Sequence, residues 1–131
     1  MDPFTCLAVA IFFESRGEPY EGKEAVANVI INRVEDKRYP NSVCGVVNEH
    51  KAFSYTHDGL HDDPTRHTGH QDKIAWADSQ EVAKEALRGN TLGITSTHYH
   101  AISVLVFWAN HYTLDGKIGN HIFYTNETPY K

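Results

Sequence analysis

The chain has 131 residues, of which 40% are hydrophobic and 22% charged, and its net charge is −5. This length supports one domain with one core, spanning residues 1–131, and the composition excludes a disordered chain. The negative charge argues against nucleic acid or an anionic membrane as partner, and the longest apolar run, Leu7 to Phe13, is too short for membrane insertion.

The first predicted helix covers Phe4 to Arg16, where apolar residues recur at helical spacing. Glu14 lies on the same face of this helix as Leu7 and Ile11, because these residues are three and four positions apart. A Gly/Pro turn follows at once and ends the helix. The sequence therefore predicts a carboxylate on the apolar face of a core helix, at the helix end.

A carboxyl group held against apolar neighbours has a raised pKa, because burial disfavours its charged form. Glu14 could then donate a proton near neutral pH, which makes it the main catalytic candidate. The alternative from spacing alone is that Glu14 simply pairs with Arg16 or Arg33 at the helix end.

We expect three more helices, at Glu21–Glu35, in a short stretch after Ser42, and at Asp72–Arg88. Thr5, Ser42 and Asp72 are the candidate N-caps, and Gly89 is the candidate stop of the last helix. Between Phe53 and Gln71 no apolar period is visible, which predicts a long surface loop.

The C-terminal part changes to β-branched and aromatic residues. Thr95–Ala101 and His121–Asn126 alternate as short strands do, and Asp115-Gly116-Lys117 is the predicted turn between them. The fold class is therefore α+β, mainly helical with a small C-terminal antiparallel β element. We expect Cys6 and Cys44 to be two buried thiols rather than a bridge, because the core is large and no export signal is visible.

Several short motifs lie along the chain: Glu14-Ser15-Arg16-Gly17-Glu18-Pro19, Gly22, Ala25 to Val29, Asn32-Arg33-Val34, Tyr39-Pro40, Val43-Cys44, Val46-Val47, Phe53-Ser54, Thr97 to His100, Trp108-Ala109 and Ile118 to Tyr124. Together these motifs resemble the SleB-like cell wall hydrolase family, the spore-cortex-lytic type. The resemblance covers nearly the whole chain apart from Asp58 to His70.

The resemblance implies a lysozyme-like domain related to lytic transglycosylases, acting on the glycan strands of peptidoglycan without a cofactor. It implies that Glu14 is the catalytic acid. It also implies that the cleft takes contributions from Phe53, Ser54, Tyr99, His121 and Tyr124. Aromatic rings suit such a polymer because they stack on sugar faces, although we expect Trp108 and Phe123 to fill the core.

The two-carboxylate route of glycosidases needs a second acid about 5 to 9.5 Å away. No second acid stands out, since Glu18 lies beyond the Gly/Pro break and is expected to brace the turn. In a one-acid route Glu14 protonates the oxygen between N-acetylmuramic acid and N-acetylglucosamine and then deprotonates the attacking hydroxyl. Attack by the sugar's C6 hydroxyl gives a 1,6-anhydro end and attack by water gives hydrolysis; the resemblance favours the first.

Two other functions stay open. A zinc-dependent amidase or peptidase could use the loop histidines His57, His61, His67 and His70, although no His-Glu-x-x-His motif is present. The second function is that of a non-catalytic wall-binding module. Such modules usually occur as repeats, which this chain lacks, and a binding module would have no reason to bury Glu14. We expect a monomer. With no signal-peptide pattern, we also expect it to be made in the cytoplasm, as in a phage endolysin released through a separate pore.

Overall fold

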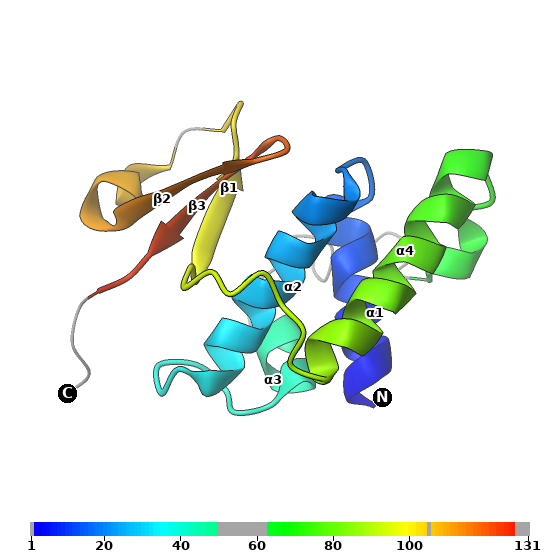
Figure 1. Ribbon diagram of the computed structural model, residues 1–131, viewed down its shortest axis with the longest axis horizontal. Coiled ribbons are helices and arrows are strands. Elements are labelled where there is room, and N and C mark those ends of the chain that lie inside the picture. The colour runs from blue at the N-terminus through cyan, green and yellow to red at the C-terminus, as the bar shows by residue number, and fades with distance from the viewer. Residues whose placement is uncertain (1, 50–62, 105, 128–131) are drawn as a thin grey trace.

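The helices of this protein lie together and carry a small sheet on one side (Figure 1). The computed structural model describes residues 2–49, 63–104 and 106–127. Its helices are α1 (Pro3–Ser15), α2 (Tyr20–Glu35), α3 (Val43–Asn48) and α4 (His70–Leu87), with the short 3-10 helices η2 (Pro64–Arg66) and η3 (Phe107–His111). Its strands are β1 (His98–Ala101), β2 (Thr113–Ile118) and β3 (His121–Thr125). Within these described ranges, no helix has the length and apolar character needed to cross a membrane.

Helix α1 is the centre of the helical layer and packs against α2, α3 and α4. It is apolar on almost every side, which is the pattern of a fully surrounded helix. Its N-cap is Asp2, whose carboxylate accepts from the backbone N–H of Thr5 at 2.8 Å. The predicted N-cap, Thr5, is wrong, because the helix begins one turn earlier, at Pro3.

The other helices match their predicted ranges closely. Ser42 caps α3 as predicted, accepting from Gly45 N–H at 3.0 Å. Helix α4 begins at His70 with Gly69 as N-cap, so the predicted cap Asp72 is wrong and lies in the first turn. Gly89 follows α4 with a φ of 90°, the left-handed conformation that a helix stop requires.

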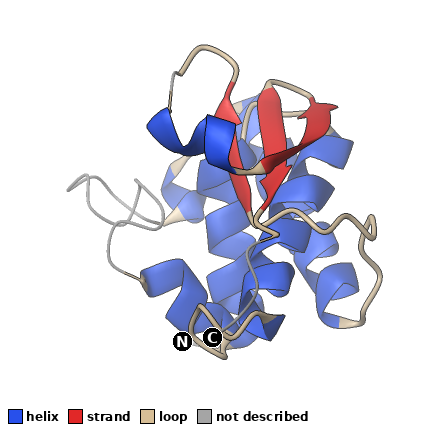
Figure 2. Cartoon of the chain, turned by 90° about the vertical axis from the view of Figure 1, so that its left-hand side faces the viewer, coloured by secondary structure: helices blue, strands red, loops and turns tan. Residues whose placement is uncertain are grey.

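The sheet is antiparallel with the order β1-β3-β2. Figure 2 shows the strands together on one side of the helices, with η3 beside them. Phe123 of β3 is buried against Ala25 and Val29 of α2, which fixes which face of the sheet meets the helices. Its role as a core residue is confirmed. Because strand residues alternate, His121 lies on that face and Tyr124 on the other.

The predicted turn at Asp115–Lys117 is wrong, because these residues lie inside β2. The hairpin instead turns at Gly119-Asn120, between β2 and β3. The register jumps from Leu114 to Gly116, so Asp115 is the extra residue of a β-bulge. Its carboxylate accepts hydrogen bonds from Ser96 and Thr125. An Asp-Gly pair suits a bulge as well as a turn, and the sequence alone does not separate the two.

Helix α2 also holds the chain that leads into the sheet. Asn28 accepts from the N–H of Ile94 at 3.0 Å, and Asn32 donates to the carbonyls of Ile94 and Ser96 at 2.8 and 2.9 Å. The two asparagines are one helical turn apart, so both amides face the same extended segment. These bonds fix where β1 begins relative to α2.

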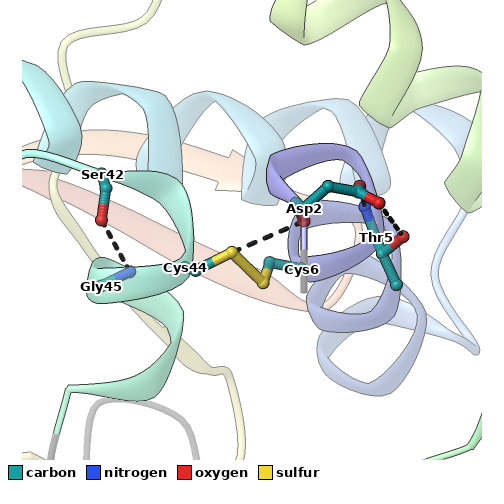
Figure 3. Close-up of a disulfide and its surroundings, with 6 residues drawn as sticks. All are labelled: Asp2, Thr5, Cys6, Ser42, Cys44 and Gly45. Atoms are coloured by element: carbon teal, nitrogen blue, oxygen red, sulfur yellow. Dashed lines mark hydrogen bonds between the residues drawn. A yellow bond between two sulfur atoms is a disulfide. The ribbon is translucent and has the colours of Figure 1, made fainter.

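Cys6 and Cys44 form a disulfide between α1 and α3 (Figure 3). The expectation of two thiols is therefore wrong. The two helices pack so that the Cα atoms lie 5.3 Å apart, within the range that a disulfide spans. This proximity comes from how α1 and α3 pack in three dimensions, which the sequence separation of 38 residues does not reveal.

Removing the disulfide should destabilise the fold. The bridge closes a loop of 38 residues, and cross-links of this size restrict the unfolded chain enough to stabilise a protein by about 2 to 4 kcal/mol. We expect Cys6→Ala combined with Cys44→Ala to lower the free energy of unfolding by that amount, and so to lower the urea midpoint. Wild-type protein measured in reductant should show the same midpoint as the double variant. An unchanged wild-type midpoint with and without reductant would contradict the bridge.

Candidate active site

Glu14 lies in the last turn of α1 and contacts the sheet. Its carboxylate accepts a hydrogen bond from the Tyr99 hydroxyl at 2.6 Å, across 85 residues of sequence. Burial raises the pKa of Glu14, while the Tyr99 hydrogen bond and the charge of Arg33 lower it in part. The predicted burial of this carboxyl group and the direction of its pKa shift are therefore confirmed. A carboxyl group in this state can hold a proton at a higher pH than an exposed one.

The two arginines considered as partners of Glu14 lie differently. Arg16 contacts His67 Nδ1 at 2.7 Å and Asp72 at 3.5 Å, so its guanidinium is directed to η2 and α4. Arg33 donates from Nε to the carbonyl of Thr97 at 2.8 Å and lies over the ring of Tyr39. Arg33 therefore acts on Glu14 as a fixed positive charge, attached to the chain segment that leads into β1.

His121 is the third predicted site residue that lies near Glu14, beside Tyr99. Its ring lies 4.9 Å from the ring of Tyr99, in an edge-on arrangement. Burial lowers the pKa of His121, against the opposing effect of Glu18. At neutral pH the imidazole is therefore uncharged. Glu14, Tyr99 and His121 form a contiguous row from the end of α1 to the start of β3.

Tyr124 does not join this row. It lies on the other face of the sheet, where its hydroxyl is hydrogen-bonded to His100 Nε2 at 2.8 Å and its ring meets Trp108 edge-on. The structure thus separates Tyr124 from Glu14, because neighbouring residues of a strand face opposite ways. Phe53 and Ser54 lie outside the described residues, so their predicted contribution stays a prediction.

The second carboxylate of the turn, Glu18, is engaged with the hairpin. It accepts from the N–H of Asn120 at 2.6 Å and from Asn120 Nδ2 at 3.0 Å. The sequence predicts that Glu18 braces its own Gly/Pro turn, but its carboxylate is bonded instead to the hairpin between β2 and β3. Sequence reasoning did not find Asn120 as its partner, although a Gly-Asn pair between two strands is a hairpin signal that points to this place.

A hollow of about 480 Å³ lies between the turn that follows α1 and the first turns of α4. Its lining includes Arg16, Glu18, Lys23, Asp72 and Asp78. Glu14 is not among the lining residues and is bonded to Tyr99 of the sheet instead. We therefore place the chemistry by the state of Glu14 and not by the size of this hollow.

The histidines of the described ranges make no metal site. Within residues 2–49, 63–104 and 106–127, no group of three His, Cys, Asp or Glu side chains could hold a metal ion. His98 packs on Tyr112 with ring centroids 4.4 Å apart, and burial lowers its pKa to about 4. His57 and His61 fall outside the described residues.

Comparison with known proteins gives a family and a fold. The family model described as Cell Wall Hydrolase matches residues 17–124. The spore cortex-lytic enzymes of Bacillus subtilis and Bacillus cereus are each 53% identical over 53 residues, which is 40% of this chain. The aligned part is 17% and 20% of those two proteins, so the chain matches about a fifth of their length. The family match begins three residues after Glu14.

Two solved structures resemble nearly the whole chain. The catalytic domain of the germination-specific lytic transglycosylase SleB from Bacillus anthracis superposes with a TM-score of 0.75 at 31% identity, over 94% of this chain and 93% of that one. The catalytic domain of Bacillus cereus SleB gives the same TM-score and identity, over 94% of this chain and 89% of that one. These likenesses include the mainly helical layer and the small C-terminal sheet.

Replacing Glu14 with Gln should stabilise the fold at neutral pH. Because burial raises the pKa of Glu14 above its ordinary value of 4.5, the folded chain favours the protonated form. The stability that this form provides is complete below pH 4.5 and is lost as the pH rises through the raised pKa. Gln keeps the shape and an acceptor for Tyr99 without a charge. Each unit of pKa shift is worth about 1.4 kcal/mol, so the urea midpoint of Glu14→Gln should be higher at pH 7.

The difference between the two proteins should vanish below about pH 4, where Glu14 is protonated. Glu21→Gln is the matched control, because Glu21 is an exposed carboxylate in the first turn of α2. That change should alter stability by only a few tenths of a kcal/mol. Equal midpoints of wild type and Glu14→Gln at pH 7 would contradict the burial argument.

Proposed function

Because the chain belongs to the cell wall hydrolase family, we propose that it cleaves the β-1,4 bond between N-acetylmuramic acid and N-acetylglucosamine in peptidoglycan, as a lytic transglycosylase. The observation that carries this proposal is the state of Glu14, a half-buried carboxyl group with a raised pKa and a tyrosine hydroxyl bonded to it. The SleB catalytic domain that superposes on this chain is itself described as a lytic transglycosylase.

Glu14 performs both proton transfers in this proposal. As the acid it protonates the glycosidic oxygen, and the bond from that oxygen to C1 of the muramic acid breaks. As a carboxylate it then takes the proton of the C6 hydroxyl of the same sugar, whose oxygen bonds to C1. The product is a 1,6-anhydromuramic end, no water is consumed, and Glu14 regains its proton.

Transfer to C6 is favoured over hydrolysis by the surroundings of Glu14. A two-carboxylate hydrolase holds its second acid at a short fixed distance. Among the described residues, Arg33 is the charged group that shifts the pKa of Glu14, and no carboxylate does so. Glu18, the nearest acid in sequence, is bonded to Asn120. The one-acid route therefore suits the groups that surround Glu14.

Tyr99 has a positioning role in this proposal. Its hydroxyl holds one oxygen of Glu14 and stabilises the carboxylate after the first proton transfer. The other oxygen is then left to exchange protons with the substrate. His121, beside Tyr99, is proposed to contact the sugar, and Phe53 and Ser54 keep the same proposed role.

The substrate is proposed to be the glycan strand, bound by a monomer without nucleic acid or membrane insertion. The release route through a phage-encoded pore is also a proposal. The Cys6–Cys44 bridge supports a working place outside the reducing cytoplasm, because disulfides persist in oxidising compartments. Parallel digestion of spore cortex and vegetative wall would show which form of peptidoglycan is cleaved, since the named relatives are spore cortex-lytic enzymes.

Digestion of purified peptidoglycan by the wild type should release fragments with 1,6-anhydromuramic ends. Glu14→Gln should lower their formation by at least about 1000-fold, because it removes the proton donor while keeping the shape of the side chain. Mass spectrometry distinguishes the products, since an anhydro end lacks the mass of one water. Glu21→Gln, which removes an exposed carboxylate, should digest like the wild type. Reducing ends would indicate hydrolysis, and released stem peptides would refute glycan cleavage.

Replacing Tyr99 with Phe should move the alkaline limb of the pH profile. The Tyr99 hydrogen bond lowers the pKa of Glu14, so its loss raises that pKa. Because the reaction starts from protonated Glu14, the activity of Tyr99→Phe should persist to higher pH than that of the wild type. The maximal rate should fall by about 10-fold as the carboxylate loses its fixed orientation. A limb that stays in place or moves to lower pH would show that the hydroxyl does not control Glu14.

A further inference from the structure

Glu18 occupies a space that the chain leaves open for it. A Cβ atom on Gly22 would lie 2.9 Å from Glu18 Cβ, and one on Gly119 would collide with Glu18 Oε1. Gly119 also has a φ of 60°, which side chains other than glycine rarely adopt. The two glycines belong to different elements, one in α2 and one in the hairpin. Both are needed for the carboxylate to sit where it does.

The carboxylate of Glu18 is almost fully enclosed, with 9% of the side chain exposed. It receives the backbone N–H and the side-chain amide of Asn120, so both of its oxygens accept hydrogen bonds. Hydrogen bonds to an enclosed carboxylate are stronger than those between neutral groups. They fix the tip of the hairpin against the turn that follows α1, and Figure 1 shows these two turns near each other.

His121 follows the tip directly and faces the same carboxylate. Its Nδ1 lies 3.6 Å from Glu18 Oε1 and is buried without a hydrogen-bond partner among the described residues. A carboxylate beside one ring nitrogen favours the tautomer with the proton on that nitrogen. The His121 ring also lies against Tyr99, whose hydroxyl donates to Glu14.

We propose that Glu18 is a positioning residue, whose carboxylate fixes the hairpin tip through Asn120 and orients the His121 imidazole so that Tyr99 is held against Glu14. The contacts run from Glu14 through Tyr99 and His121 to Glu18. Glu18 is only four residues after Glu14 in the sequence, so the chain itself closes the path. The end of α1 thus carries the acid, and the turn directly after it carries the carboxylate that holds the sheet beside that acid. The catalytic consequence rests on the proposed function of Glu14.

Glu18→Gln is the informative change, because it keeps the size of the side chain but replaces one acceptor with a donor. That donor faces Asn120 Nδ2, itself a donor, so either the Asn120 amide turns over or the hairpin tip shifts, and in both cases the negative charge beside His121 Nδ1 is lost. We expect kcat on soluble peptidoglycan fragments to fall by about 10- to 100-fold with KM changed much less, because small misplacements near a site reduce the rate of chemistry. Glu21→Gln, an equal loss of charge three residues away on the exposed side of α2, should leave kcat unchanged.

A compensating change separates positioning from a general loss of structure. In Glu18→Gln combined with Asn120→Asp, the new donor meets a new acceptor, and the net charge returns to that of the wild type. We expect kcat of this pair to recover toward the wild type by about 10-fold. A single Glu18→Gln variant with kcat within about twofold of the wild type would overturn the proposal. A pair no better than the single variant would also overturn it.

The state of the His121 ring gives a readout that does not depend on glycan cleavage. Nitrogen-15 NMR distinguishes a protonated from an unprotonated ring nitrogen. In the wild type we expect the proton of neutral His121 on Nδ1, and in Glu18→Gln a shifted tautomer balance. An identical His121 spectrum in both proteins would refute the role of Glu18. If the wild type gives no anhydro ends while the His121 spectrum changes as expected, the proposed function fails and the positioning role stands.

Discussion

The hydrogen bond between Tyr99 and Glu14 is the contact on which the site depends, because it joins the end of α1 to the first strand of the sheet. An enclosed carboxyl group is costly unless it is protonated or hydrogen-bonded. Here the Tyr99 hydroxyl and the nearby positive charge of Arg33 stabilise the carboxylate of Glu14. Burial raises the pKa of Glu14, and these two groups lower it in part. The acid can therefore hold a proton and also part with it, which a deeply buried carboxyl group could not do.

The sheet reaches Glu14 because polar side chains of the helical layer direct it there. Asn28 and Asn32 bind the backbone ahead of β1, and Glu18 binds the tip of the hairpin. Lys23 is buried as well, and its ammonium donates to the carbonyl of Glu18 at 2.6 Å, which fixes the turn itself. Apolar contact alone, through Phe123, would leave the angle of the sheet loosely defined. Hydrogen bonds have direction, so this set specifies the orientation.

The sequence predicted most helices and the acid, because both depend on local spacing. The apolar period of residues 4–16 already places Glu14 on the inner face, and no tertiary information is needed for that step. Other features depend on how segments meet. The Cys6–Cys44 bridge follows from the packing of α1 on α3, and the separation of Tyr124 from Tyr99 follows from which sheet face meets α2. The Asp115 bulge looked like a hairpin turn because both use the same residue types.

That bulge has a consequence for how the chain behaves among its own copies. β2 is an edge strand, and an edge strand with a straight row of free backbone groups invites another chain to add a strand. At Asp115 the row is interrupted by an extra residue, and its carboxylate is turned back to Ser96 and Thr125. Gly116 follows with a φ of 138°, which twists the strand further. The β2 edge of the sheet is thus a poor template for aggregation, even beside the exposed side chain of Leu114.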